Sequence, residues 1–335
     1  MPPAPTFTVS VSGAWRATAG TLSRLMTRAP LFWGILLMLL TTGLWALAFI
    51  VPVVLNGSSA AEITVGRFFV YGVLSLASLG ATRTGQLSWR LFGTAFLLAL
   101  AGNVAFYFIL TLGIQLSGAT FAILAIGMVP VTISLFGRMT ADEGALKDIA
   151  LPLGLFIVGV ATFNLGKTDF LRDLSDFSAL GTLCLLACLV MWTWYAIANA
   201  RFLRRHTNID AREWNSLIGA ASLVAVLLAA PIFYALGELR NPLAIPREEM
   251  ASIVWWSIIL GGGSTWLAYL LFNLAARLLK VSLLGQLIIF EAIFGVFYVF
   301  LVSGKIPNLV ELAGMAVALL GIWWSVRRLQ RERRA

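Results

Sequence analysis

The chain has 335 residues, of which 60% are hydrophobic and only 12% are charged, and its formal net charge is +9. Soluble domains average about 45–50% apolar and about 25% charged residues, so these few charged side chains cannot cover a water-soluble fold of this length. The composition excludes a cytosolic enzyme, a nucleic-acid-binding protein and a disordered scaffold. It indicates an integral membrane protein whose surroundings are the lipid bilayer.

Residues 1–30 are rich in Pro, Ser, Thr and Arg and contain no acidic residue. This composition favours a cytoplasmic N-terminal tail, and a transit peptide is the alternative. No short apolar region with a small-residue cleavage site precedes the first apolar run, so we expect no removed secretory signal.

Crossing a hydrocarbon core about 30 Å thick takes about 20 apolar residues at 1.5 Å per residue. The long apolar runs show no two-residue alternation, so they favour helices over the strands of a barrel. We predict an all-α membrane protein with ten transmembrane helices, over residues 31–54, 62–81, 91–112, 114–137, 148–165, 178–202, 213–237, 251–275, 280–303 and 308–326.

The basic residues agree with an even number of spans and a cytoplasmic N-terminus. Of the 24 Lys and Arg residues, Arg67 lies inside a span and 18 fall on the predicted cytoplasmic side. The outer side holds five, namely Lys167, Arg172, Arg240, Arg247 and Lys305. This split is what the positive-inside rule expects, so the positive charge indicates topology rather than a nucleic-acid partner.

The two halves of the chain resemble each other weakly. A shift of 162 residues places Leu112 on Leu274, Tyr107 on Tyr269 and Gly159 on Gly321, and a shift of 147 places Trp45 on Trp192. Each half contains five predicted spans, an odd number, so the halves would enter the membrane from opposite sides. We therefore predict two inverted five-helix repeats, over 31–165 and 178–326, followed by a basic cytoplasmic tail, 327–335.

The order of motifs resembles the EamA-type branch of the drug/metabolite transporter superfamily, which includes YddG-like amino-acid exporters. The matching segments are Gly127–Val131 in the fourth span, Phe290–Ala292 in the ninth and Gly314–Gly321 in the tenth. The resemblance covers roughly 31–326, and it implies a ten-helix exporter of the bacterial inner membrane with both termini cytoplasmic. Family members often carry Pro at Ala292 and Glu at Lys305, so a mechanism that needs acidic residues in both repeat-related loops is weakened.

Glu291 is a charged residue in the middle of a predicted span, about 11 residues or roughly 16 Å from either end of 280–303. A charge at the bilayer centre costs about 2.5–3.5 kcal/mol, so such a side chain normally faces the bundle interior or a water-filled cavity. Desolvation favours its neutral form, so Glu291 could take and release a coupling proton, or it could hold a substrate ammonium. The alternative is a hydrogen bond that only holds the bundle together.

Arg67 lies about five residues from the outer end of the span 62–81, roughly 8 Å deep. Its long side chain could reach the membrane interface. It could instead pair with Glu291 or bind a substrate carboxylate.

Further polar and aromatic residues at depth suit a cavity for an amphipathic metabolite. For each of them helix packing is the alternative. They are Trp45, Tyr107, Tyr269, Trp192, Tyr195, Trp266 and Asn103.

Three residues are candidate hinges. Pro130 removes a backbone hydrogen bond and Gly127 beside it softens the same turn, while Gly262 is the centre of a Gly triplet in the eighth span. Simple helix packing is again the alternative.

We expect a non-enzymatic secondary transporter that exports a small metabolite, such as an amino acid, amine or drug-like compound, by alternating access. A passive facilitator and a sugar-phosphate or nucleotide-sugar carrier are the alternatives. No cofactor or metal is expected, because Cys184 and Cys188 lack neighbouring ligands and His206 is the single histidine. No Walker loop indicates ATP hydrolysis. The sequence leaves the oligomeric state open.

Overall fold

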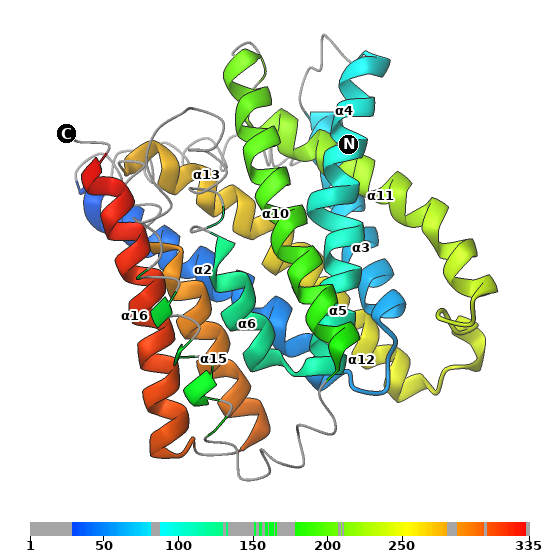
Figure 1. The fold of residues 1–335 in the computed structure, drawn as a ribbon. Helices are drawn as coiled ribbons and strands as arrows, with labels where there is room; N and C mark the ends of the chain where they lie inside the picture. The colour runs from blue at the N-terminus through cyan, green and yellow to red at the C-terminus, as the bar shows by residue number, and fades with distance from the viewer. Residues whose placement is uncertain are drawn as a thin grey trace, which may run out of the picture.

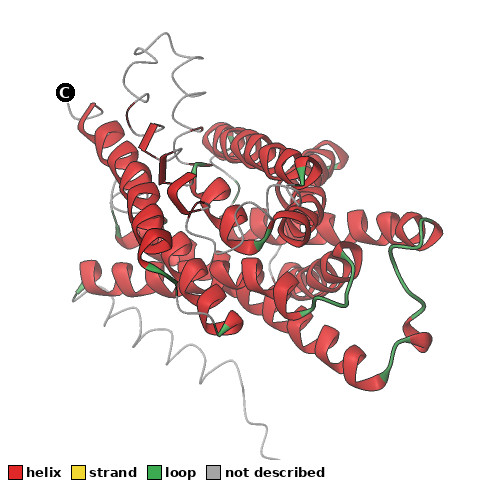
Figure 2. Ribbon diagram, turned by 60° about the horizontal axis from the view of Figure 1, so that its bottom comes forward, coloured by secondary structure: helices red, strands yellow, loops and turns green. Residues whose placement is uncertain are grey.

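The computed structural model describes residues 29–81, 88–129, 132, 178–206, 209, 211–279, 287–304 and 307–332, together with 151, 154–155, 158–159, 161–163 and 165. Within these residues all regular structure is helical, and no strand is present (Figure 2). This agrees with the predicted all-α membrane protein.

The helices follow one another with short connections. In the first half they are α2 (Pro30–Val54), α3 (Ala60–Ala81), α4 (Trp89–Ala99), the π-helix η1 (Leu100–Val104), α5 (Ala105–Ser117) and α6 (Ala119–Gly127). In the second half they are α10 (Ala179–Arg205), α11 (Ala211–Ala235), the 3₁₀ turn η2 (Pro242–Ala244), α12 (Arg247–Ile258), the π-helix η3 (Ile259–Leu267), α13 (Ala268–Leu278), α15 (Ile289–Ser303) and α16 (Leu309–Glu332).

Several helix ends have a local cause in the sequence. Ser88 caps α4 by accepting a hydrogen bond from the Leu91 amide at 3.2 Å, and Ser178 caps α10 in the same way from Gly181 at 2.9 Å. Gly118 separates α5 from α6 with φ of 86°, a conformation that glycine adopts readily. We had expected the third and fourth spans to separate near residue 113, and the structure moves this break to Gly118.

Six helices of the described residues are long and apolar enough to cross a membrane. They are Pro30–Val54, Ala60–Leu79, Trp89–Ser117, Ala179–Asn199, Arg212–Ala235 and Arg247–Ala275. Two shorter apolar helices, Phe290–Ser303 and Leu309–Gly321, fall within the ninth and tenth predicted spans. Most of the predicted span 148–165 and the second half of 114–137 lie outside the described residues, so the count of ten stays a prediction.

Helices from the two halves pack against each other more than they form separate bodies. α3 packs along α11, α2 packs along α13 and α15, and α10 packs along α5 (Figure 1). The largest buried cluster includes Phe68, Tyr71 and Tyr107, and it takes side chains from both halves. The core therefore lies between the halves.

α3 and α11 approach closely where Gly72 meets Gly219. A Cβ added at Gly72 would lie 3.1 Å from the carbonyl oxygen of Gly219, and one added at Gly219 would lie 2.9 Å from the ring of Tyr71. Small residues of this kind let two membrane helices bring their backbones together.

This close approach predicts the effect of one methyl group. We expect Gly72→Ala to lower the free energy of unfolding by about 1–3 kcal/mol, because the new Cβ overpacks the α3–α11 contact. Gly93→Ala is the matched control, since its Cβ would meet nothing within 4 Å and Ala favours the helix. Thermal unfolding of the detergent-purified protein measures both, and a Gly72→Ala midpoint equal to that of Gly93→Ala would contradict the packing.

Candidate functional site

Arg67 is a buried cation with specific partners from two other helices. Only 9% of its surface is exposed, although it lies seven residues, or about 10 Å, beyond the start of α3. Its Nε donates a hydrogen bond to Thr265 Oγ1 of η3 at 3.0 Å. Its Cζ lies 4.0 Å from the ring centre of Tyr107 on α5 and 5.4 Å from that of Phe68. Arg67 therefore points into the bundle and not to the membrane interface.

The groups that hold Arg67 are themselves held by backbone carbonyls. Thr265 Oγ1 donates to the carbonyl oxygen of Leu260 at 2.8 Å, five residues earlier, which matches the register of the π-helix η3. The Tyr107 hydroxyl donates to the carbonyl oxygen of Ala48 on α2 at 3.2 Å. The guanidinium therefore rests on a fixed frame built from both halves of the chain.

Glu291 lies on the inner side of α15. Ile293 and Phe297 of the same helix are 39% and 55% exposed and mark its outer side. Glu291 precedes Ile293 by two residues, which corresponds to a rotation of about 200°. Its half-buried carboxyl interacts electrostatically with the guanidinium of Arg67 and with Tyr269. The structure thus brings Arg67, Glu291 and Tyr269 into one region, as predicted.

The depth of Glu291 needs a closer description than the sequence provided. The structure begins α15 at Ile289 and places Glu291 in its first turn, rather than halfway along a continuous helix over 280–303. Phe294 and Tyr298, on the next two turns of α15, lie beside Gly43 near the middle of α2. Glu291 therefore lies about one helical turn from the midpoint of α2.

Aromatic side chains surround this region. Trp45 contacts Tyr269 edge to face, with ring centres 5.8 Å apart, and Phe272 at 5.5 Å. Trp192 contacts Tyr195 at 5.1 Å, and Tyr195 lies near enough to Tyr269 to interact with it. Trp45, Tyr269 and Tyr195 thus belong to the same group as Arg67.

Other candidates lie apart from this group. Asn103 donates to Ser222 Oγ of α11 at 3.0 Å, so its amide joins two helices, and Trp266 packs against the main core cluster. Gly262 lies inside η3 and Gly127 is the last residue of α6, while Pro130 lies outside the described residues.

The two π-helices were not predicted. The shift of 162 residues places η1, Leu100–Val104, on residues 262–266, which lie within η3, Ile259–Leu267. π-Helices are rare and are frequently found at functional sites. Asn103 and Gly262 were chosen from the sequence for polarity and for backbone freedom, and both turn out to lie in these segments.

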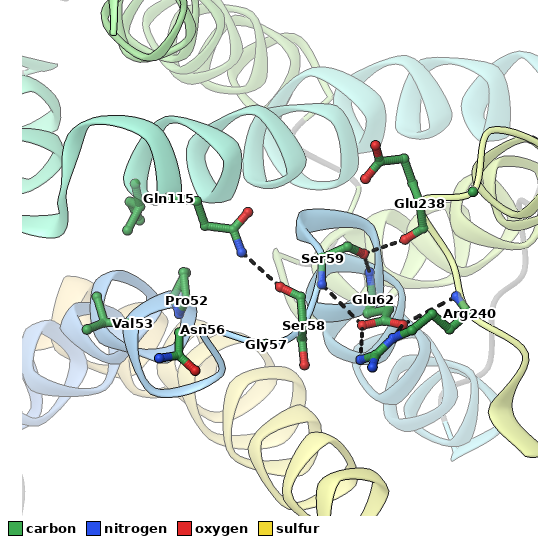
Figure 3. A pocket seen from close by; sticks show the side chains of 12 residues that line it. Pro52, Val53, Asn56, Gly57, Ser58, Ser59, Glu62, Gln115, Glu238 and Arg240 are labelled. Atoms are coloured by element: carbon green, nitrogen blue, oxygen red, sulfur yellow. Dashed lines mark hydrogen bonds and ion pairs between the residues drawn. The ribbon is translucent and has the colours of Figure 1, made fainter. Parts of the chain in front are cut away.

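A second polar group, also not predicted, links α3 to the connection between α11 and α12 (Figure 3). Arg240 Nε lies 2.7 Å from Glu62 Oε1, and its Nη2 lies 2.8 Å from Glu62 Oε2 and 2.6 Å from Glu249 Oε1. These hydrogen bonds, that of Glu62 above all, raise the pKa of the Arg240 guanidinium. We call Glu62, Arg240 and Glu249 the outer ion cluster.

The outer ion cluster borders a pocket of about 660 Å³. Gln115 Nε2 donates to the carbonyl oxygen of Ser58 at 2.9 Å, and Ser59 Oγ donates to that of Glu238 (Figure 3). The pocket thus gathers the end of α2, the start of α3, the end of α5 and the α11–α12 connection, all of which the topology prediction assigns to the outer side.

Removing the charge of Glu62 tests the outer ion cluster. Glu62→Gln leaves Arg240 without its two-oxygen partner, so we expect the thermal midpoint to fall by a few degrees at low salt and the difference to shrink in 1 M NaCl, since ions screen partly exposed pairs. Glu248→Gln, at an exposed position in the same first turn of α12 as Glu249, is the control. Equal midpoints for the two variants would show that the cluster contributes no stability.

Comparison with known proteins supplies the family. No protein-family model matches the chain. A solved crystal structure shares the fold with a TM-score of 0.59 at 17% identity, covering 89% of this chain and 97% of the other. The chain is 30% identical over 308 residues to the inner membrane protein YtfF of Escherichia coli (strain K12), which covers 88% of this chain and 95% of YtfF. The chain therefore belongs to the same family as YtfF.

Proposed function

We propose that this protein is a secondary transporter that exports a small metabolite across the inner membrane by alternating access. The observation that carries the proposal is the buried group of Arg67, Tyr107, Tyr269 and Glu291 at the junction of the two halves. Charged residues within membrane spans are costly and commonly mark a transport path. The relationship to YtfF, whose name places it in the inner membrane, supports the location.

The packing supports an inverted repeat. α2, the first helix of its half, packs on α13 of the other half, and α10, the first helix of the second half, packs on α5. Gly34 of α2 is approached by Leu279, while Gly181 of α10 is approached by Ser117. The shift of 147 relates the two glycines, and the shift of 162 relates their two neighbours. Such reciprocal contacts are expected of two halves related by a two-fold axis.

Both halves contribute to the site. Arg67 and Tyr107 come from the first half, whereas Thr265, Tyr269 and Glu291 come from the second. A rocking motion of one half against the other would change the distances between these groups while their own helices stay intact. The site is thus placed where alternating access would alter its geometry.

Glu291 is the residue that we assign to coupling. A carboxyl at this depth is neutral when protonated and pairs with the positive charge of Arg67 when ionised. A change of exposure from one side of the membrane to the other could therefore release and rebind a proton. Recognition of a substrate amine by the same carboxylate is the other role open to it.

Replacing this carboxyl tests coupling. We expect Glu291→Gln to abolish uptake driven by a proton gradient into inside-out vesicles, with folding and insertion unchanged, because the amide cannot carry the proton. Compounds that shift the thermal midpoint in a panel of amino acids, amines, nucleosides and sugars serve as substrates. Glu248→Gln is the exposed control. Accumulation by Glu291→Gln at the wild-type level contradicts coupling, and wild-type counterflow without accumulation identifies a passive facilitator.

The orientation can be tested with two exposed positions. Trp89 is 89% exposed at the start of α4 and Leu243 is 95% exposed between α11 and α12. In a background without the buried Cys184 and Cys188, we expect Leu243→Cys to react with an impermeant thiol reagent in intact cells. We expect Trp89→Cys to react only after the membrane is opened. Labelling of both cysteines from outside would contradict the proposed topology.

A further inference from the structure

The guanidinium of Arg67 leaves most of its hydrogen-bonding capacity unused. A guanidinium carries five N–H donors. Among the described residues, Thr265 is the acceptor for Nε, and no acceptor is found there for Nη1 or Nη2. Nor does any carboxylate of the described chain lie within 4.0 Å of this side chain. The terminal edge of a buried cation is therefore available to a ligand.

The frame around Arg67 fixes the direction of this edge. Thr265 holds Nε, and the ring of Tyr107 lies 4.0 Å from Cζ, so both the nitrogen nearest the chain and one region of the guanidinium surface are occupied. Each of these two partners is in turn bound to a backbone carbonyl. A guanidinium fixed in this way loses little entropy when it forms two parallel hydrogen bonds with a planar anion.

Glu291 does not complete the pairing in this conformation. Its carboxyl interacts with the charge of Arg67 but lies beyond ion-pair distance of it. A buried charge that lacks a hydrogen-bonded counter-ion costs free energy, and an incoming anion would recover part of that cost. The aromatic side chains of Phe68, Tyr107 and Tyr269 near the guanidinium suit an apolar body attached to such an anion.

We propose that Arg67 binds the carboxylate of the transported compound, so that the substrates are small carboxylates with an apolar or aromatic body. This inference rests on the proposed transport function and names its substrate class. Arg67 would contact the substrate directly, while Thr265 would act as a positioning residue through Arg67. A phosphate dianion fits less well, because it would need more than one cation for neutralisation.

The test compares probes that differ in one group. 3-Phenylpropionate and 3-phenylpropionamide, benzoate and benzamide, and hexanoate and hexanamide are titrated into the detergent-purified full chain by calorimetry. For at least one pair, we expect the carboxylate to bind about tenfold or more tightly than its amide. Equal binding within every pair, or no carboxylate binding, overturns the proposal. Displacement of the carboxylate by an equal concentration of inorganic phosphate also overturns it.

Variants assign the preference to Arg67. Arg67→Gln should remove the preference for the carboxylate while binding of the amide stays unchanged, and Arg67→Lys should keep part of it. Thr265→Val, which keeps the shape and loses the acceptor, should weaken carboxylate binding alone. Arg247→Gln, at an exposed arginine, is the control. If Arg67→Gln does not fold, an undiminished preference in both Arg67→Lys and Thr265→Val overturns the proposal, as an undiminished preference in Arg67→Gln does.

Transport by the wild-type protein separates this inference from the function on which it rests. In vesicles, accumulation of a compound without a carboxylate, together with equal binding within the probe pairs, would support the transporter and overturn the carboxylate site. Carboxylate binding that depends on Arg67, without any transport or counterflow, would support the site and overturn the transporter.

Discussion

A single buried guanidinium, held between helices of both halves, is the interaction on which the rest of the structure depends. Arg67 could not stay 9% exposed inside an apolar bundle without Thr265 and the ring of Tyr107. Both partners need particular backbones, a π-helix for Thr265 and a carbonyl of α2 for Tyr107. One charge thus constrains α2, α3, α5 and η3 together, and it brings the two halves into register at their junction.

The scaffold is nearly symmetric, whereas its polar groups are not. The shift of 147 residues places Arg67 on Trp214, whose Nε1 donates to Asn199 at 2.7 Å in a separate apolar cluster. The shift of 162 places Asn103 on Thr265, and Asn103 binds Ser222 rather than a cation. The duplication therefore explains the matching helices and π-segments, while the charged site exists in one copy. A rocking motion needs the first property, and a defined substrate needs the second.

The sequence predicted much of this arrangement, and its failures have physical reasons. Long apolar runs located the described helices, and the cost of a charge in lipid pointed to Arg67 and Glu291. The π-helices depend on a backbone register that side-chain periodicity does not encode. The pairing of Glu62 with Arg240, 178 residues away, depends on two loops meeting in space, although both residues were near predicted outer ends. Glu291 lies in a first turn because α15 starts at Ile289, and an uninterrupted apolar run gave no sign of that start.

The central claim is that the junction of the two halves opens alternately to each side of the membrane. Its most direct test is the reactivity of a cysteine at Tyr269, in protein without Cys184 and Cys188, towards a small hydrophilic thiol reagent applied from each face. Alternating access predicts that right-side-out and inside-out vesicles both react, and that a transported compound slows both reactions. Labelling from one face alone, or from neither, would contradict the account.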